Sequence, residues 1–282
     1  MSRCHFAVSF RSLFVVASFA LVASSAALSQ AASYTFESLT AGTLAGQDAW
    51  VDFGGAGSNH SVTTVAPAHV GGSTKVATGF DQSVRVNDGN FSYNPHSATD
   101  TAALMEFDVR AGSGDTAVMA LGRDLAFSTH SQLGPQFGIW GGLNTFMIRG
   151  AVEGGISQAA LTGTDSVNDW YRLRMVVDFT ANSGNGAGSL YVRNLTDGET
   201  DFRLAPVLSN INLQILNMET ASENPGSWNS MYLRSAEAGT LFDDLNPNAF
   251  VAPPLVPEPS TCVLVSLGLT VLLTSRRRAR LA

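Results

Sequence analysis

The chain has 282 residues with 16 basic and 23 acidic side chains, which gives a formal net charge of −7 at pH 7. The two ends, residues 1–31 and 256–282, hold six arginines and one acidic residue, which leaves 10 basic and 22 acidic residues between them. This acidic middle lacks the basic face that neutralises phosphates, so the composition argues against nucleic-acid binding. Both cysteines, Cys4 and Cys262, lie in the ends, so the middle has no disulfide, no thiolate zinc site and no cysteine nucleophile.

Residues 1–31 have the layout of a secretory signal peptide. Arg3 and Arg11 supply positive charge, residues 13–22 form the apolar core, and residues 29–31 (Ser-Gln-Ala) fit a small-x-small cleavage site. An uncleaved anchor is the alternative, but the apolar run is short and its flank is rich in Ala and Ser. The sequence therefore predicts export, with removal of this segment by signal peptidase, and one domain over residues 32–250.

Within this domain the dominant pattern is an alternation of apolar and polar side chains, which is clearest in residues 170–180. One face of the segment carries Tyr171, Leu173, Met175, Val177 and Phe179. The other face carries Arg172, Arg174 and Asp178, with Val176 as the exception. A period of two is typical of a half-buried antiparallel strand. The Gly- and Asn-rich residues 182–188 then predict a turn, and residues 189–193 the returning strand of a hairpin.

Other segments alternate in the same way. Residues 104–111 place Met105, Phe107 and Val109 on one side and Glu106, Asp108 and Arg110 on the other. Further strands are expected at residues 83–86, 116–121, 136–140, 146–148, 211–215, 231–234 and 240–245. Turn-forming residues separate these segments, no stretch has a convincing helical period, and no internal repeat of fixed length is present. The pattern predicts an all-β, antiparallel sandwich or barrel.

Three passages resemble the concanavalin A-like superfamily of jelly-roll lectins and glucanases. They are Tyr34-Thr-Phe-Glu-Ser-Leu39 with residues 41–50, the Trp-Tyr strand of residues 169–178, and Leu241-Phe-Asp-Asp-Leu245. In the last passage Asp244 stands where the family pattern has Asn. The resemblance implies an antiparallel jelly-roll β-sandwich whose first and last strands lie side by side.

The strand face that carries Glu106 and Asp108 resembles the catalytic strand of the glucanases in this superfamily. Retaining glycoside hydrolysis needs a nucleophile and an acid/base carboxylate about 5 Å apart. The third position of the strand is Arg110, and a guanidinium cannot act as the proton donor. Gly-x-Ser-x-Gly and His-Glu-x-x-His motifs are also absent. We therefore expect a non-enzymatic protein with no catalytic residues, in which this strand face is solvated; a secreted glycoside hydrolase or lyase is the alternative.

The resemblance also implies a structural calcium ion between the first and last strands, with Glu37 and Asp243 as candidate ligands. Carboxylate oxygens suit calcium, and a cation would help to hold a domain without disulfides. The alternative is a pair of hydrogen-bonded or solvated carboxylates, since no calcium-loop motif is present. The histidines of the domain lie in loop-like sequence and are expected at the surface: His60, His69, His96 and His130.

Two tryptophans are candidates for a glycan-binding platform. Phe137 and Ile139 share one strand face, which leaves Trp140 on the other, next to Gly141 and Gly142. Trp228 lies in loop-like sequence, Asn-Pro-Gly-Ser-Trp-Asn. Core or rim packing is the alternative for both rings. Trp50 and Trp170 belong to the family-like passages and are expected in the core.

The C-terminal segment has three parts. Residues 251–260 form a Pro-rich linker, in which Pro257 and Pro259 hold the Pro-Glu-Pro segment extended, a form that a protease can thread. An uncharged run follows, and residues 260–275 would span roughly 24 Å as a helix, which is short for a bilayer but usable with local thinning. We expect a transmembrane helix over residues 261–275 and a cytoplasmic tail over residues 276–282. The tail carries the arginines Arg276, Arg277, Arg278 and Arg280.

This order of motifs resembles the PEP-CTERM sorting signal of Gram-negative, matrix-forming bacteria. The resemblance implies that an exosortase-type membrane protease recognises Pro257-Glu258-Pro259 and processes the protein, first anchored in the inner membrane, for the cell surface or extracellular matrix. An ordinary tail anchor after a Pro-rich linker is the alternative. Together these features predict an exported surface or matrix protein with a structural or weakly glycan-binding β-sandwich, and an exopolysaccharide as a candidate partner.

Overall fold

The computed structural model describes residues 34–53, 60–65, 74–79, 81–85, 101–112, 116–123, 133–218, 228–236 and 239–246. The expected signal peptide, Pro-Glu-Pro segment, transmembrane helix and Arg-rich tail all lie outside these residues. Within the described residues, no helix combines the length and the apolar character needed to cross a membrane.

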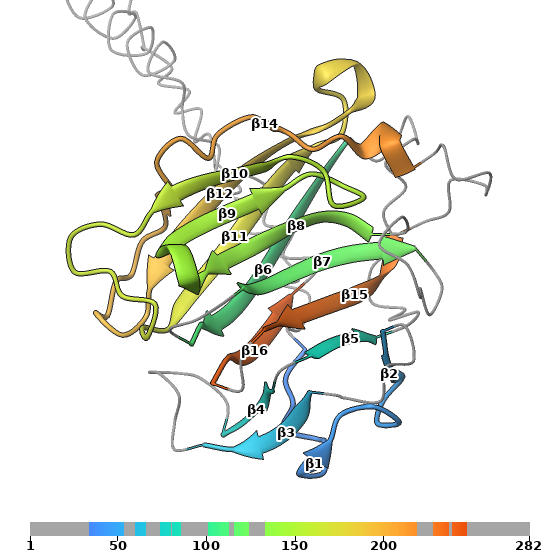
Figure 1. Ribbon diagram of the computed structural model, residues 1–282, viewed down its shortest axis with the longest axis vertical. Coiled ribbons are helices and arrows are strands. Elements are labelled where there is room, and N and C mark those ends of the chain that lie inside the picture. The colour runs from blue at the N-terminus through green and yellow to red at the C-terminus, as the bar shows by residue number, and fades with distance from the viewer. Residues whose placement is uncertain are drawn as a thin grey trace, which may run out of the picture.

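The described residues form two antiparallel sheets, whose strands Figure 1 shows in order. The larger sheet has nine strands, in the order β1-β3-β4-β16-β6-β11-β12-β13, with β14 also paired to β12. Their bounds are β1 Gly42–Thr43, β3 Ser61–Thr64, β4 Lys75–Thr78, β16 Leu241–Asn246, β6 Ala102–Arg110, β11 Tyr171–Asp178, β12 Ala187–Asn194, β13 Arg203–Leu204 and β14 Ile211–Asn212.

The second sheet has seven strands, in the order β10-β9-β8-β7-β15-β5-β2. Their bounds are β10 Ile156–Ala160, β9 Thr145–Arg149, β8 Leu133–Trp140, β7 Thr116–Arg123, β15 Trp228–Ser235, β5 Asp81–Arg85 and β2 Trp50–Asp52. The helical elements of the described residues are short 3₁₀ turns: η2 Gly141–Leu143, η3 Asn182–Gly184 and η4 Ile215–Met218. The prediction of an all-β chain with two antiparallel sheets is confirmed.

The strand predicted for residues 170–180 is β11, and its two faces differ as expected. Tyr171, Leu173, Met175 and Val177 are buried, while the residues between them are partly exposed. The predicted hairpin is also present, because β12 returns antiparallel to β11 with Met175 opposite Leu190. On its other edge β11 pairs with β6. The apolar face of each strand therefore points into the same core.

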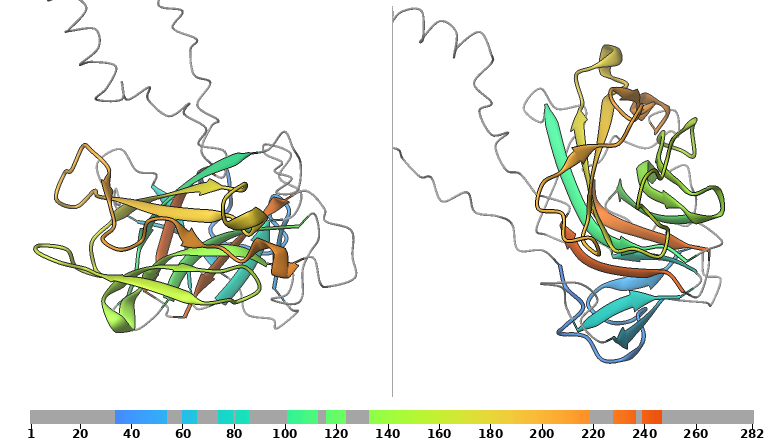
Figure 2. Two further views of the ribbon diagram at one scale, coloured as in Figure 1. Left: turned by 90° about the horizontal axis from the view of Figure 1, so that it is seen from above. Right: turned by 90° about the vertical axis from the view of Figure 1, so that its left-hand side faces the viewer.

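The core lies between the two sheets, which the views of Figure 2 show as two layers. Phe107 of the nine-stranded sheet meets Phe137 of the seven-stranded sheet edge to face, with their ring centroids 5.0 Å apart. Trp50 and Trp170 are buried, as predicted. An aromatic group at one end joins Trp50 to Tyr34, whose hydroxyl accepts a hydrogen bond of 3.0 Å from the indole.

The first and last described segments lie side by side, as the family resemblance implies. Tyr34 forms an isolated antiparallel bridge with Leu245 of β16, in which each backbone N–H donates to the carbonyl of the other residue. This bridge joins the two ends of the sandwich in a domain without cysteine.

Some strands differ from the sequence-based expectation. Residues 211–215 form a strand only at Ile211 and Asn212, and the chain then turns into η4, although Leu213 and Ile215 are buried as alternation predicts. The strands β1, β3, β4 and β10 were not predicted, because they are short and lack a clear alternation of apolar and polar residues.

Candidate functional site

The candidate site lies on the outer face of the seven-stranded sheet, the face turned away from the core. Along β8 the side chains of Phe137 and Ile139 enter the core, so Gln136, Gly138 and Trp140 belong to the outer face. The residues that share this face on the neighbouring strand β9 are Thr145, Met147 and Arg149.

Trp140 lies on this face as predicted, and its side chain is partly exposed. Thr145 is directly opposite it in the β8–β9 ladder. The Thr145 hydroxyl oxygen is buried and, among the described residues, has no hydrogen-bond partner. Two positions away, Gly138 adds no side chain, so the surface beside the indole stays low. An aromatic ring thus lies next to a hydroxyl group that can still donate and accept hydrogen bonds.

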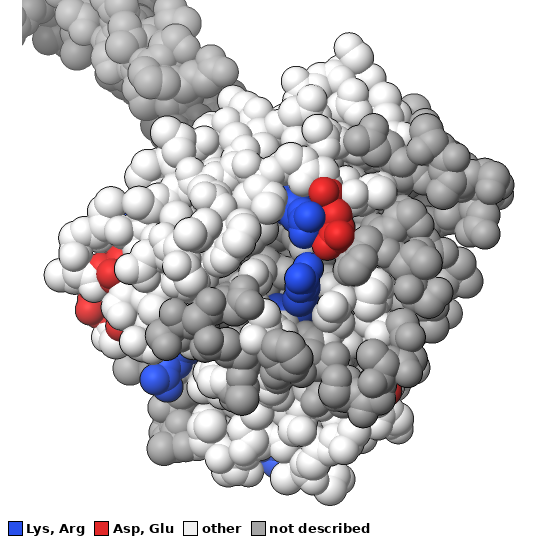
Figure 3. All heavy atoms as spheres, viewed as in Figure 1, with Lys and Arg blue, Asp and Glu red and all other residues white. Residues whose placement is uncertain are grey.

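Charged side chains gather near the middle of the same face, which Figure 3 shows from outside. Glu153, in the turn after β9, accepts hydrogen bonds from Arg149 Nη1 at 2.9 Å and from Arg234 Nη1 at 3.3 Å. Arg149 comes from β9 and Arg234 from β15, so this carboxylate links two strands that are not neighbours in the sheet. All three side chains are between 22% and 29% exposed, so solvent and ligands can reach them.

Gln136 lies beside this charged group, because it is the direct cross-strand partner of Arg149. The residue is only 1% exposed, and its amide nitrogen Nε2 has no hydrogen-bond partner among the described residues. The same holds for Arg149 Nε. Sequence analysis did not identify Gln136, Arg149, Glu153 or Arg234. The alternation that placed Trp140 on the outer face also places Gln136 on it. That Gln136 is paired with Arg149 depends on the register of β8 and β9, which only the structure gives.

The carboxylates proposed as a catalytic alternative, Glu106 and Asp108, lie on the opposite sheet and are engaged in ion pairs. Asp108 is fully buried, and its two oxygens accept from Arg172 Nε at 2.6 Å and Nη2 at 2.7 Å. Glu106 pairs with Arg174. The expectation that this strand face is solvated was wrong, because arginines of β11 lie directly opposite both carboxylates and cover them. No oxygen of Asp108 is left for a reaction with substrate.

Arg172 also binds Asp244, whose Oδ2 lies 2.7 Å from Nη2. Burial alone would lower the pKa of Arg172, but the hydrogen bonds and charge of Asp108, with the charge of Asp244, raise it above its usual value. Asp244 has a positive φ of 44°, a conformation that Asn and Asp tolerate better than most residues.

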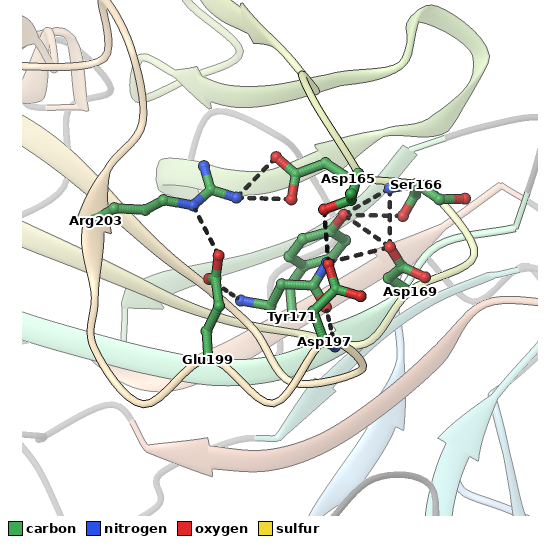
Figure 4. Close-up of polar contacts among 9 residues, drawn as sticks. Asp165, Ser166, Asp169, Tyr171, Asp197, Glu199 and Arg203 are labelled. Carbon is green, nitrogen blue, oxygen red and sulfur yellow. Dashed lines mark hydrogen bonds and ion pairs between the residues drawn. The ribbon is translucent and has the colours of Figure 1, made fainter.

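A second polar cluster, shown in Figure 4, joins two loops beyond the ends of β11 and β12. Arg203 Nη2 donates to both oxygens of Asp165 at 2.7 Å, and the Tyr171 hydroxyl donates to the Ser166 carbonyl at 3.0 Å. Asn194 donates to Asp169 at 3.1 Å. These contacts tie the loops to the sheet. Within the described ranges no group of three or more His, Cys, Asp or Glu side chains is arranged to hold a metal ion.

The two candidate calcium ligands lie in different surroundings. Glu37 is exposed, and its carboxylate accepts hydrogen bonds from the backbone N–H of Lys75 at 3.0 Å and from the Thr74 hydroxyl at 2.9 Å. These hydrogen bonds, with that of the Thr74 backbone, lower the pKa of Glu37. Asp243 is fully buried and accepts from the Asp244 N–H at 2.8 Å. Calcium binding by this pair stays a prediction.

Trp228, the other candidate platform, lies in the core. It is 2% exposed and packs edge to face against Phe179, with 5.7 Å between the ring centroids. A buried indole cannot stack on a sugar. Trp228 is therefore a core residue, which was the alternative to a glycan-binding platform.

The expectation that His60 lies at the surface was wrong, because the residue is completely buried between the sheets. Its ring nitrogens lie 2.9 Å from Ser83 Oγ and 2.8 Å from Ser235 Oγ, and Phe242 meets the ring edge to face. Burial lowers the pKa of His60 to about 3. The polar residues around it in the sequence give no sign of burial, because both serines come from distant strands. His69, His96 and His130 lie outside the described residues.

Comparison with known proteins adds little. No protein-family model matches the chain, and no curated protein matches it. Among solved structures, the carbohydrate-binding module CBM66 from Bacillus subtilis is similar at 12% identity, with a TM-score of 0.38 over 70% of this chain and 93% of that module. An endo-β-galactosidase from Clostridium perfringens that releases GlcNAcα1-4Gal is similar at 12% identity, with a TM-score of 0.30 over 78% of this chain and 58% of that enzyme.

Proposed function

We propose that this chain is an exported, non-enzymatic protein of the cell surface or extracellular matrix, and that its β-sandwich binds glycan weakly through the outer face of the seven-stranded sheet. The observation that carries the proposal is the pairing of Trp140 with Thr145 on adjacent strands. Sugar rings have apolar faces and hydroxyl edges. A partly exposed indole offers a surface to the former. The adjacent Thr145 hydroxyl, which is buried and has no partner among the described residues, can serve the latter once its side chain turns toward the ligand.

Trp140 and Thr145 are held in place by the sheet, which supports a role in ligand binding. Trp140 is the last residue of β8 and Thr145 is the first residue of β9, and the two are paired across the ladder, so the ring and the hydroxyl keep a fixed relation. A site that needs no ordering on binding loses less conformational entropy when the ligand arrives. Few contacts are available, however, so we expect one domain to bind one sugar unit weakly. The apparent affinity should rise when several protein molecules bind to one polysaccharide or when they are held together.

The non-enzymatic part of the proposal is supported by the state of the carboxylates. Glycoside hydrolysis needs two carboxyl groups free to approach a sugar, whereas Asp108 and Glu106 are occupied by Arg172 and Arg174. On the outer face of the seven-stranded sheet, Glu153 is bound by two arginines. No observation in the described residues favours the alternative of a hydrolase or lyase.

Export and sorting are proposed from the two ends of the chain. The charged, apolar and small residues of segment 1–31 support secretion. Pro257-Glu258-Pro259, the apolar run and the terminal arginines support processing by an exosortase-type protease after anchoring in the membrane. A β-sandwich delivered in this way would meet exopolysaccharide outside the cell.

The test is a glycan-array screen of the purified full-length chain in detergent, followed by affinity measurements on the glycans retained. Trp140→Ala should weaken binding by about tenfold, since a central aromatic contact carries much of such an interface. Trp140→Phe should retain part of the affinity. Leu143→Ala is the matched control, because Leu143 is 54% exposed directly after β8 but lies in η2. Binding that is insensitive to Trp140→Ala, or release of sugar from the retained glycans, would contradict the proposal.

A further inference from the structure

The outer face of the seven-stranded sheet holds a second group of side chains, which lies near the middle of β8, four positions before Trp140. Gln136 and Arg149 are direct cross-strand partners in the β8–β9 ladder, and both point away from the core. Side chains in this relation have Cβ atoms about 5 Å apart. The amide of Gln136 and the guanidinium of Arg149 are therefore close enough to bind one small chemical group together.

Both residues have hydrogen-bond donors that are buried and unused. These donors are Gln136 Nε2 and Arg149 Nε, neither of which has a partner among the described residues. Leaving a buried donor unpaired costs stability, so natural proteins rarely keep two at one place without a use. A guanidinium has donors only, so the Arg149 observation holds whichever way the Gln136 amide is turned. The missing partner must supply acceptor oxygens.

The charge of the group favours an anion. Arg149 and Arg234 share the single carboxylate of Glu153, which leaves one positive charge among the three side chains. Glu153 binds Nη1 of Arg149, whereas the Nε–H lies on a different side of the guanidinium from Nη1 and has no hydrogen-bond partner among the described residues. An incoming anion would meet Arg149 on this second edge, and Arg234 would reduce its repulsion from Glu153.

We infer that Gln136 and Arg149 bind the carboxylate of an acidic sugar, so that the glycan recognised by this face contains uronic acid. A carboxylate presents two coplanar oxygens, one for the Arg149 Nε–H and one for the Gln136 amide. The inference rests on the proposed glycan binding, to which it adds the class of sugar.

The position of this pair relative to Trp140 fits an oligosaccharide. Gln136 and Trp140 are four positions apart on an extended strand, a distance of about 13 Å. The ring and the carboxylate site therefore contact different sugar units of one chain. Between them on the same face lie Gly138, which has no side chain, and its cross-strand partner Met147 of β9, which is 1% exposed.

The experiment compares the affinity of the full-length protein for matched acidic and neutral probes. The probes are oligogalacturonate, an alginate oligosaccharide, the carboxyl-reduced form of each, and a sulfated dextran oligomer. We expect at least one uronate oligomer to bind about tenfold more tightly than its reduced form, and this preference to shrink as salt is added. Equal affinity for the acidic and reduced forms, preference for the sulfated oligomer, or no binding to any probe would overturn the inference.

Variants connect the preference to the two side chains. Arg149→Gln and Gln136→Glu should each lower the affinity for the uronate oligomer far more than the affinity for the reduced oligomer, so that the preference for uronate is lost. Arg110→Gln removes one positive charge from the opposite sheet and should change neither affinity. Melting curves of each variant check that the fold is kept, and Arg149→Lys serves as a milder second variant with the charge retained. Preference that survives Arg149→Gln would overturn the inference.

The same measurements separate this inference from the proposed function. If Trp140→Ala weakens binding of the reduced oligomers but Arg149→Gln has no selective effect, glycan binding stands and the uronate inference fails. If Trp140→Ala has no effect on any probe that binds, the proposed function fails as well.

Discussion

His60 and Ser235 are 175 positions apart in the sequence, yet His60 Nε2 and Ser235 Oγ lie 2.8 Å apart between the two sheets. Ser235 donates its own hydroxyl proton to the Gly79 carbonyl, so its oxygen accepts from the imidazole N–H. Nδ1 of the neutral ring is then the acceptor, and it receives a hydrogen bond from Ser83 at 2.9 Å. The ring is thus satisfied in its neutral form, in one tautomer, and links β5 and β15 to the segment before β3.

This arrangement predicts a loss of stability in acid. Burial lowers the pKa of His60 to about 3 in the folded protein, compared with 6.5 for an exposed histidine. Between these values the unfolded chain binds a proton that the folded chain does not, so stability is complete above pH 6.5 and falls as the pH falls. The loss at pH 4.5 should be about 3 kcal/mol, and urea unfolding from pH 7.5 to 4 measures it.

His60→Gln should reduce this slope, since glutamine can hydrogen-bond to the two serines but does not titrate. His130→Gln is the control, because that histidine is expected at the surface from the sequence alone. If the two variants show the same pH dependence as the parent, the buried neutral ring is not the source of the effect.

A second prediction concerns the buried ion pair of Asp108 and Arg172. Asp108→Asn leaves Arg172 with only part of its compensating charge, which should cost ~3 kcal/mol of unfolding free energy. Glu199→Gln is the comparison at a more exposed pair, since the side chains of Glu199 and Arg203 are each 35% exposed, with Oε1 and Nε 3.4 Å apart. It should cost less than about 1 kcal/mol. Equal losses in urea unfolding would show that burial does not set the strength of these pairs.

Much of the architecture was predictable, because the alternation of apolar and polar side chains along a strand indicates which of its faces is turned toward the core. That reasoning located β6, β8 and β11 and turned Trp140 outward. It failed where burial depends on partners far away in sequence. His60 is buried by serines of two distant strands, and Glu106 and Asp108 are covered because the register of β6 and β11 sets arginines opposite them. The pairing of Gln136 with Arg149 also depends on register, which alternation alone does not give.

A third prediction concerns sorting. Replacing Pro257 and Pro259 with alanine should remove the extended segment that the proposed exosortase-type protease recognises. The protein should then stay in the membrane at full length, which immunoblots of membrane and released fractions measure. Alanine at Pro253 and Pro254 is the control, because these prolines lie in the same linker outside the motif. Processing and release like the parent would contradict the sorting proposal.

The last prediction concerns Gly138, which lies between the two ends of the proposed binding face. A Cβ at this position would approach the Ala117 carbonyl oxygen to 2.0 Å and the Val118 Cα to 2.8 Å. Both are backbone atoms of β7, so relief would require β8 to move away from its neighbour. Gly138→Ala should therefore cost about 2 kcal/mol of unfolding free energy.

Gly239→Ala is the matched control, since a Cβ there meets nothing within 4 Å, and it should change stability by less than about 0.5 kcal/mol. Because Gln136 and Trp140 share β8 with Gly138, a shift of that strand should also weaken glycan binding in molecules that remain folded. Weaker binding below the melting transition, with the control unchanged, would show that the face depends on the close contact of β7 and β8. Unchanged stability would show instead that β8 can move at little cost, and the two ends of the face would then not be rigidly placed.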